Sequence, residues 1–209
     1  MTRTVLLLVA FLVSALPLQA APITFTASLD GPSESPSNAS PATGLALVTI
    51  DDILHTLRVQ VTFADLTAGN TAAHIHVING PGDANTADTL GPVATTTPTF
   101  TGFPSGATSG SYDNTFDLLL NSTYRAGFIT DSGGTPELAA IALITGIAEG
   151  RAYLNIHTSN FPGGEIRGFL QPQVAAVPEP ASLLLLGSGL AAAVARRRRQ
   201  RDRQRPSAS

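Results

Sequence analysis

The sequence predicts a mainly β protein, an antiparallel β-sandwich or barrel with one short helix. Several short stretches alternate hydrophobic with polar residues, and clusters of Gly, Pro, Asn and Asp separate these stretches. One later segment has its hydrophobic residues at helical spacing instead. Charged residues make up only 13 % of the 209 residues, so a coiled coil or an array of charged, solvated helices is not expected.

Four strands are expected in the first half of the chain. Residues 23–29 and 55–63 alternate hydrophobic and polar side chains, as in a sheet with one face in the core and the other in water. Residues 44–50 and 72–78 are the other two strands, and the Pro- and Ser-rich residues 31–42 form a loop.

The second half of the body continues with a long loop. Residues 79–110 are rich in Gly, Pro, Asp, Asn and Thr, and we expect one short strand within them at 93–100. Residues 111–118 are a further strand. Residues 151–158 and 165–171 are expected to form a closing hairpin.

One helix is expected at residues 136–148. Its hydrophobic residues recur at helical spacing, and Pro136 and Glu137 suit a first helical turn. Gly150 ends it. Short strands with turn signals between them, and a single helix, together favour the sandwich or barrel.

The N-terminus has the order of a secretory signal peptide. Arg3 precedes an apolar run at residues 5–18, and small residues follow at Ala20 and Ala21. We expect the Sec translocon to export the chain and signal peptidase to remove residues 1–20, which leaves a domain at residues 21–175. An uncleaved membrane anchor is the alternative, but the apolar run is short for a span.

The C-terminus contains a second apolar segment, residues 181–195. As a helix it would reach about 22 Å, whereas the hydrocarbon core of a bilayer is about 30 Å thick. The Arg block that follows would resist translocation and leave residues 200–209 as a basic cytoplasmic tail. The alternative is a buried core helix with a solvated basic tail.

This end resembles the PEP-CTERM sorting signal of Gram-negative bacteria over residues 177–199. The resemblance rests on a Pro-Glu-Pro tripeptide, the apolar segment and an Arg cluster: Pro178, Glu179, Pro180, Arg196, Arg197, Arg198 and Arg199. It implies transient anchoring in the inner membrane, processing by an exosortase, and delivery to the cell surface or extracellular matrix. Exopolysaccharide or surface proteins are the partners that it implies there.

The charge and the missing residue types exclude several functions. Between residues 21 and 175 there are four Arg, no Lys and thirteen acidic residues, so this body repels phosphate backbones and no nucleic-acid partner is expected. The chain has no Cys and no Lys, which excludes disulfides, thiolate metal sites, a P-loop and a Schiff-base lysine.

Three histidines form the candidate site. His74 and His76 are two residues apart on a predicted strand, so both imidazoles leave one face with Cα atoms about 6.6 Å apart. His157 lies on the polar face of a later strand. If the two strands approach each other, the three can hold one Zn²⁺ or Cu²⁺ ion, with Glu165 or water as the fourth ligand. Ordinary hydrogen bonding of these histidines is the alternative.

Two motifs in the body resemble the CHRD domain, first named from chordin. The first is residues 73–76 followed by Gly80, and the second is residues 150–158 followed by residues 163–168. The likeness runs from about residue 23 to residue 172. It implies an extracellular β-rich domain of the kind found in many secreted bacterial proteins.

A fainter likeness is to Cu/Zn superoxide dismutase, where a His-x-His on a strand also precedes a Gly/Asp-rich loop, here residues 80–83. Dismutases need more His ligands and usually a disulfide, whereas this chain has four His and no Cys. The likeness therefore implies a sandwich of immunoglobulin or dismutase type and at most one metal ion, but not the reaction.

Two functions from different classes follow. The first is a non-enzymatic surface or matrix protein whose CHRD domain is a binding or structural module, with room for one metal ion at the three histidines. The alternative is a secreted metalloenzyme with dismutase-like redox or hydrolytic chemistry at the His cluster. We favour the first, because no nucleophile or general acid or base is identifiable beside the three histidines.

Overall fold

The computed structural model describes residues 21–83, 90–173 and 196–197. The chain divides into two compact units between Gln173 and Val174, and the fold below is that of the first unit. The predicted signal peptide, the Pro-Glu-Pro tripeptide, the apolar segment 181–195 and the basic tail lie outside the described residues. Arg196 and Arg197 are described, and both are exposed. Among the helices that the structure describes, none has the length and apolar character needed to cross a membrane.

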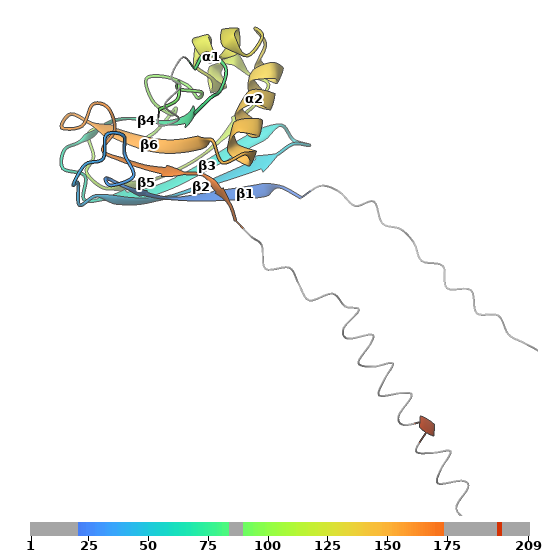
Figure 1. The fold of residues 1–209 in the computed structure, drawn as a ribbon, viewed down its shortest axis with the longest axis horizontal. Coiled ribbons are helices and arrows are strands. Elements are labelled where there is room, and N and C mark those ends of the chain that lie inside the picture. The colour runs from blue at the N-terminus through green and yellow to red at the C-terminus, as the bar shows by residue number, and fades with distance from the viewer. Residues whose placement is uncertain (1–20, 84–89, 174–195, 198–209) are drawn as a thin grey trace, which may run out of the picture. The chain divides into compact units, whose positions relative to one another are not determined.

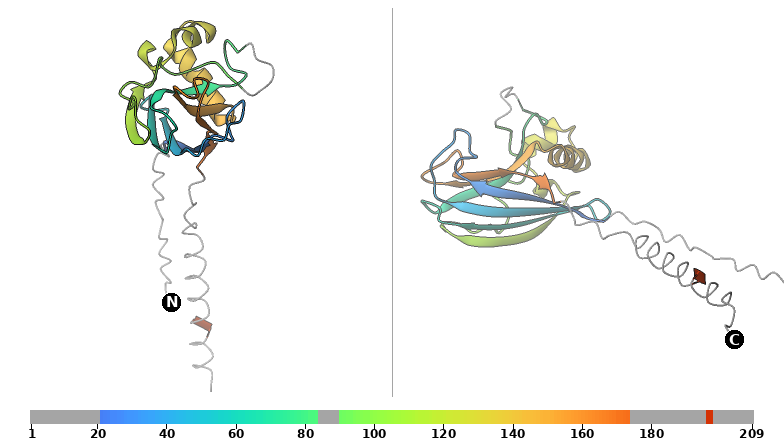
Figure 2. Two further views of the ribbon diagram at one scale, coloured as in Figure 1. Left: turned by 90° about the vertical axis from the view of Figure 1, so that its left-hand side faces the viewer. Right: turned by 60° about the horizontal axis from the view of Figure 1, so that its bottom comes forward.

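Eight strands in the described part of the chain form one antiparallel sheet that curls into a half-barrel (Figures 1 and 2). Their spatial order is β4-β6-β7-β1-β2-β3-β5, and β8 pairs with β1. The strands are β1 (Ile23–Asp30), β2 (Thr43–Asp51), β3 (Thr56–Ala64), β4 (Asn70–Val77), β5 (Gly110–Asp117), β6 (Ala152–Thr158), β7 (Ile166–Phe169) and β8 (Gln171–Pro172). The predicted mainly β, antiparallel fold is confirmed.

The alternation of side chains explains the first three strands. In β1, Phe25, Ala27 and Leu29 are buried, while the residues between them are partly or fully exposed. β1 pairs with β2 without a break from Ile23 opposite Ile50 to Asp30 opposite Thr43. A shift of one residue would turn every one of these side chains to the wrong face, so the hydrophobic pattern determines the register.

The structure corrects three sequence expectations about strands. β3 begins at Thr56 rather than at His55, because His55 has a φ of 52° and belongs to the turn before the strand. The predicted strand at 93–100 contains only isolated bridges. The predicted strand at 165–171 is divided between β7, which pairs with β6, and β8, which pairs with β1.

The loop that replaces the predicted strand at 93–100 runs along the free edge of β4. Ala94 donates its backbone N–H to the carbonyl of Ile75, and Phe100 donates to the carbonyl of Ala73. The loop therefore covers an edge that would otherwise present unpaired backbone groups.

The predicted helix is α2 (Pro136–Ala148), with the expected bounds. The Thr135 hydroxyl accepts a hydrogen bond from the N–H of Leu138, and Pro136 occupies the first turn, where its missing N–H costs nothing. The helix packs against β4, β6 and β8. The structure adds α1 (Ala126–Asp131) and the 3₁₀ turn η1 (Asn121–Thr123), which are too short for a periodic pattern to show.

The hydrophobic core lies inside the half-barrel, and all of its buried members fall between Phe25 and Leu170. Phe100, from the long loop, is fully buried with its ring 5.9 Å from that of Tyr112 and 5.7 Å from that of Phe116. The first unit thus carries its own core, so we expect residues 21–173 to fold as a separate domain.

Candidate metal centre

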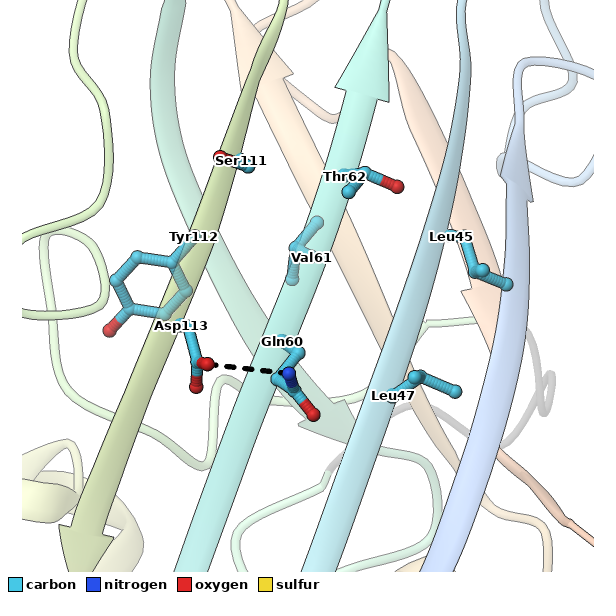
Figure 3. Close-up of a pocket in the computed structure, with 8 residues that line it drawn as sticks. All are labelled: Leu45, Leu47, Gln60, Val61, Thr62, Ser111, Tyr112 and Asp113. Atoms are coloured by element: carbon cyan, nitrogen blue, oxygen red, sulfur yellow. Dashed lines mark hydrogen bonds between the residues drawn. The ribbon is translucent and has the colours of Figure 1, made fainter.

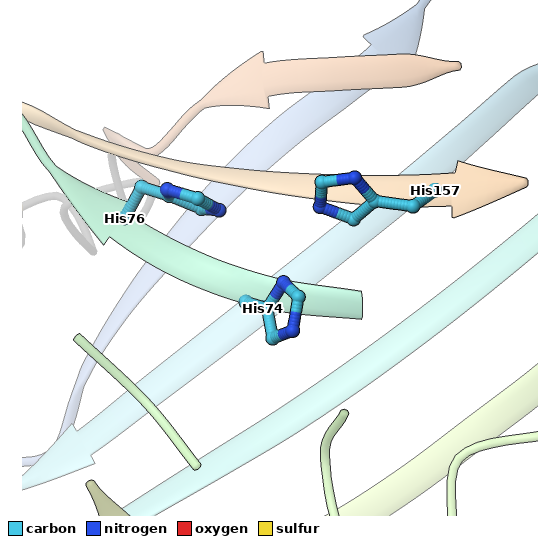
Figure 4. Close-up of side chains that lie close together, drawn as sticks. All are labelled: His74, His76 and His157. Carbon is cyan, nitrogen blue, oxygen red and sulfur yellow. The ribbon is translucent and has the colours of Figure 1, made fainter. Parts of the chain in front are cut away.

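Pairing of β4 with β6 brings the three histidines together. Ala72 lies opposite His157, His74 opposite Asn155, and His76 opposite Tyr153. Because side chains alternate along a strand, all three imidazoles leave the same face of the sheet, as Figure 4 shows. The other face of both strands, with Ile75 among its residues, enters the core. The sequence left open whether the two strands meet, and the structure shows that they do.

The face that carries the histidines is also covered. His74 and His76 are only 7 % and 8 % exposed, and β4 is buried without interruption from Ala73 to Val77. The cover comes from loops on either side of the strands, which contact the rings through their backbone. A strand with both faces buried lacks the alternation of buried and exposed residues that β1 to β3 show.

Each imidazole is held by one backbone carbonyl. His74 Nε2 lies 2.6 Å from the carbonyl oxygen of Pro98, and His76 Nδ1 lies 2.8 Å from that of Gly91. His157 Nδ1 lies 2.9 Å from the carbonyl oxygen of Pro162. A carbonyl oxygen can only accept, so in each ring this nitrogen carries the proton. The opposite nitrogen of each ring then carries a lone pair.

The three lone pairs converge. The nitrogens opposite the carbonyl contacts are His74 Nδ1, His76 Nε2 and His157 Nε2, and all three are buried without a hydrogen-bond partner. One ligand atom from each ring lies within 4.8 Å of the others. Metal-binding histidines commonly donate their second ring N–H to a carbonyl in this way, which sets the tautomer and orients the ring. The three residues therefore fit a metal ion in both donor type and orientation.

The electrostatics keep the rings in the form that binds metal. Burial lowers the pKa of His74 to about 4 and that of His76 to about 4, although the hydrogen bonds to Pro98 and Gly91, and for His76 also the Asn155 side chain, act in the opposite direction. Burial also lowers the pKa of His157. All three are neutral at pH 7, and a neutral imidazole is the ligand form.

Further side chains surround the cluster. The ring of Tyr153 stacks on that of His76 with a centroid separation of 4.8 Å, and the guanidinium of Arg167 lies 4.9 Å from the centre of the Tyr153 ring. Arg167 also faces the buried Glu34 at 3.8 Å. Burial raises the pKa of Glu34 to about 7, and the charge of Arg167 opposes that shift. Glu34 lies in the Pro- and Ser-rich loop, where no sequence signal marked it.

Glu165 lies in a different hydrogen-bond network. Its carboxylate accepts hydrogen bonds from the Ser40 hydroxyl at 2.7 Å, the Thr67 N–H at 2.7 Å and the Thr158 hydroxyl at 2.6 Å. Burial alone would raise its pKa, but these bonds together outweigh that effect and lower the pKa. The group of metal-competent side chains in the described residues contains the three histidines and not Glu165.

These pKa values predict how the stability of the metal-free domain depends on pH. His74 and His76 stabilise the fold fully above pH 6.5, where they are neutral in both states, and lose this contribution as the pH falls through about 4. Each shift is worth about 3 kcal/mol. Glu34 acts oppositely, because its raised pKa makes its contribution largest below pH 4.5 and lost as the pH rises through about 7.

We therefore expect the free energy of unfolding to fall by at least about 3 kcal/mol between pH 7 and pH 4, since the effects of His74 and His76 together exceed that of Glu34 and the lowered pKa of His157 acts in the same direction as theirs. Urea unfolding of residues 21–173 in the presence of a chelator measures it. The variant Glu34→Gln should show a steeper fall, because it lacks the opposing group. A stability that stays constant or rises on acidification would contradict the burial of these imidazoles.

A shallow groove elsewhere on the domain carries no comparable chemistry. It lies on β2, β3 and β5, where Leu45, Thr62 and Asp113 are among its lining residues (Figure 3). Asp113 forms an exposed ion pair with Arg58 at 2.6 Å. The histidine cluster, on β4 and β6, is thus the candidate site.

Comparison with known families agrees with this division of the chain. A family model for the CHRD domain matches residues 25–170, which is more than half of the 209 residues. A second model, for the PEP-CTERM protein-sorting motif, matches residues 176–199. No curated protein and no solved structure matches the chain significantly. The first match contains all three histidines and the whole core.

Proposed function

The chain belongs to the CHRD domain family, and from this premise we propose that its CHRD domain binds one transition-metal ion through His74, His76 and His157. The PEP-CTERM motif implies export to the cell surface or the extracellular space by a route that depends on exosortase. The two matched modules are of the sorting or binding kind, consistent with a protein that is not an enzyme.

The same proposal includes the individual steps by which the protein is exported and released. The Sec translocon exports the chain, and signal peptidase removes residues 1–20. Residues 181–195 anchor it transiently in the inner membrane, with Arg196–Arg199 on the cytoplasmic side, until the exosortase cleaves it. The released domain then joins the surface proteins or exopolysaccharide outside the cell.

The observation that carries the metal site is the set of three buried nitrogens that lack partners, in rings whose other nitrogens are bonded. Histidines that served only as hydrogen-bonding residues would be expected to use both ring nitrogens when buried, because an unpaired buried polar atom costs about 1–3 kcal/mol. Three such atoms facing one another are accounted for together by a cation between them.

The donor set indicates which ion. Three neutral imidazoles suit Zn²⁺ and Cu²⁺, whereas Ca²⁺ and Mg²⁺ prefer oxygen ligands. In this site the carbonyls of Gly91, Pro98 and Pro162 keep the rings oriented and in the correct tautomer. Among the described residues no carboxylate belongs to the cluster, so the three imidazoles would be the protein ligands and water would complete the coordination of the ion.

Purified residues 21–173, stripped with a chelator and dialysed against Zn²⁺ or Cu²⁺, should take up one ion per chain, as measured by elemental analysis. The reason is that the rings are already neutral and oriented before the ion arrives. A folded domain that retains no ion at micromolar free metal would overturn the proposal.

A further inference from the structure

One end of the half-barrel presents large hydrophobic side chains to water. Its members, called the apolar rim below, are exposed residues at the start of β1 and in two neighbouring turns: Ile23, Ile53, Leu54, Leu119 and Leu120. Leu54 is 68 % exposed and Leu120 is 53 % exposed. Turns are normally polar, and contiguous exposed apolar residues usually mark a contact surface.

The sheet register places these residues at the same end. Ile23 lies opposite Ile50, one residue from the end of β2. Thr56, the first residue of β3, lies opposite Asp117, the last residue of β5. The N–H of Leu118 donates to the carbonyl of His55 at 2.8 Å, so the β2–β3 turn and the turn after β5 are joined side by side.

In both turns an aspartate carboxylate accepts hydrogen bonds from backbone N–H groups. The Asp51 carboxylate accepts hydrogen bonds from the N–H groups of Ile53 and Leu54, at 3.0 and 2.9 Å. The Asp117 carboxylate accepts from the N–H of Leu119 at 2.8 Å. In each case an aspartate closes the turn, and a pair of aliphatic residues projects from it.

The first and last residues of the domain lie at the same end as the apolar rim. The N–H of Gln173 donates to the carbonyl of Thr24 at 2.8 Å, one residue from Ile23, and Figure 2 shows the β2–β3 turn projecting at the end where β1 begins. Seven residues, 174–180, separate Gln173 from the apolar segment 181–195. Even fully extended they span at most about 25 Å, which is less than the thickness of a bilayer with its headgroups.

We propose that the apolar rim rests in the headgroup region of the membrane that residues 181–195 enter, and so holds the anchored domain with this end against the bilayer. This inference rests on the anchoring step of the proposed function. Contact with the membrane removes five aliphatic side chains from water at once. The carboxylates of Asp51 and Asp117 limit the contact to the polar interface, because charged groups do not enter hydrocarbon without a large cost.

The chain contains no Cys, so single cysteines can carry an environment-sensitive fluorophore at chosen positions. We would compare labels at Leu54→Cys and Leu120→Cys with a label at Leu45→Cys, which is an exposed leucine in β2, outside the rim. A label at Leu186→Cys reports on the anchor itself. The chain from residue 21 to residue 209 is reconstituted into phosphatidylcholine vesicles that contain a lipid with a nitroxide quencher, placed in the headgroup region for the labels at residues 45, 54 and 120 and on the acyl chain for the label at residue 186.

We expect quenching and a blue shift of the labels at residues 54 and 120, and neither for the label at residue 45. If the label at residue 186 is quenched but the labels at residues 54 and 120 behave like the label at residue 45, the inference is wrong. The anchoring step of the proposed function is supported in that case. Rim labels that are blue-shifted without vesicles would show that a second copy of the chain covers the rim, which also overturns it.

An unquenched label at residue 186 would show that the anchoring step has failed. Binding of the free domain, residues 21–173, to the same vesicles then tests the inference. Residues 21–173 should bind the same vesicles weakly, and the variant Leu54→Ser/Leu120→Ser should bind at least about tenfold more weakly. The matched variant Leu45→Ser should bind as the unsubstituted domain does. Equal binding of all three proteins, or no binding by any of them, overturns the inference.

Discussion

Replacing His157 by Ala is expected to weaken Zn²⁺ binding to residues 21–173 at least about 100-fold. The reason is that loss of a residue that only orients a metal ligand already costs 10–100-fold in affinity, and His157 supplies one of the three donor nitrogens. At a Zn²⁺ concentration 100 times the dissociation constant, the unsubstituted domain gains about 2.7 kcal/mol in unfolding free energy. The variant should lose nearly all of that gain, as titration calorimetry and urea unfolding with and without Zn²⁺ would show.

His157 is the best of the three for this test, because it is only partly buried and its replacement disturbs the metal-free fold least. The matched control is His55→Asn, at the one histidine outside the cluster. His55 is exposed with a φ of 52°, a conformation that Asn tolerates. Equal Zn²⁺ affinity of the two variants would mean that the ion, if bound, lies elsewhere.

Replacing Glu165 by Ala is expected to destabilise the domain by about 3 kcal/mol, because three donors lose their acceptor and a buried donor left without a partner costs about 1–3 kcal/mol. The side chain is fully buried, and its loss leaves the hydroxyls of Ser40 and Thr158 and the N–H of Thr67 without their acceptor. These donors come from three separate segments, so the carboxylate joins parts of the chain that nothing in the sequence links. Urea unfolding of residues 21–173 at pH 7 measures the change.

The control for this substitution is Glu149→Ala, which removes an exposed carboxylate paired with Arg151 and should cost less than about 1 kcal/mol. The folded fraction of Glu165→Ala should still bind one Zn²⁺ ion with unchanged affinity, because Glu165 is not part of the cluster. A variant that keeps its stability but binds Zn²⁺ more weakly would instead make Glu165 a metal ligand.

The two substitutions separate two kinds of buried polar group in this domain. The Glu165 carboxylate has a donor for each of its oxygens and serves the fold. The three imidazoles each retain one buried nitrogen without a partner, and that arrangement costs stability unless a ligand binds there. The three histidine nitrogens therefore need a partner that the described residues do not supply.

The sequence alone determined the strands and the helix where one structural period dominates. β1, β2 and β3 have one face in the core, so their alternation is visible along the chain. Helix α2 was marked by its hydrophobic residues, a Pro at its start and a Gly beyond its end, although Leu138 and Ile141 on its expected hydrophobic face are exposed. His74 and His76 were placed on one face by the geometry of a strand, which needs no knowledge of neighbours.

Tertiary structure alone decided that β4 lies beside β6, because strand order in a sheet depends on which surfaces bury one another and not on local spacing. It also brought Gly91, Pro98 and Pro162 to the rings, since a backbone carbonyl carries no sequence signal at all. Glu165 satisfied the local requirements of a ligand, yet donors from Ser40, Thr67 and Thr158 bind its carboxylate instead. Local patterns determine which way a side chain points, and only the packed fold determines what it meets.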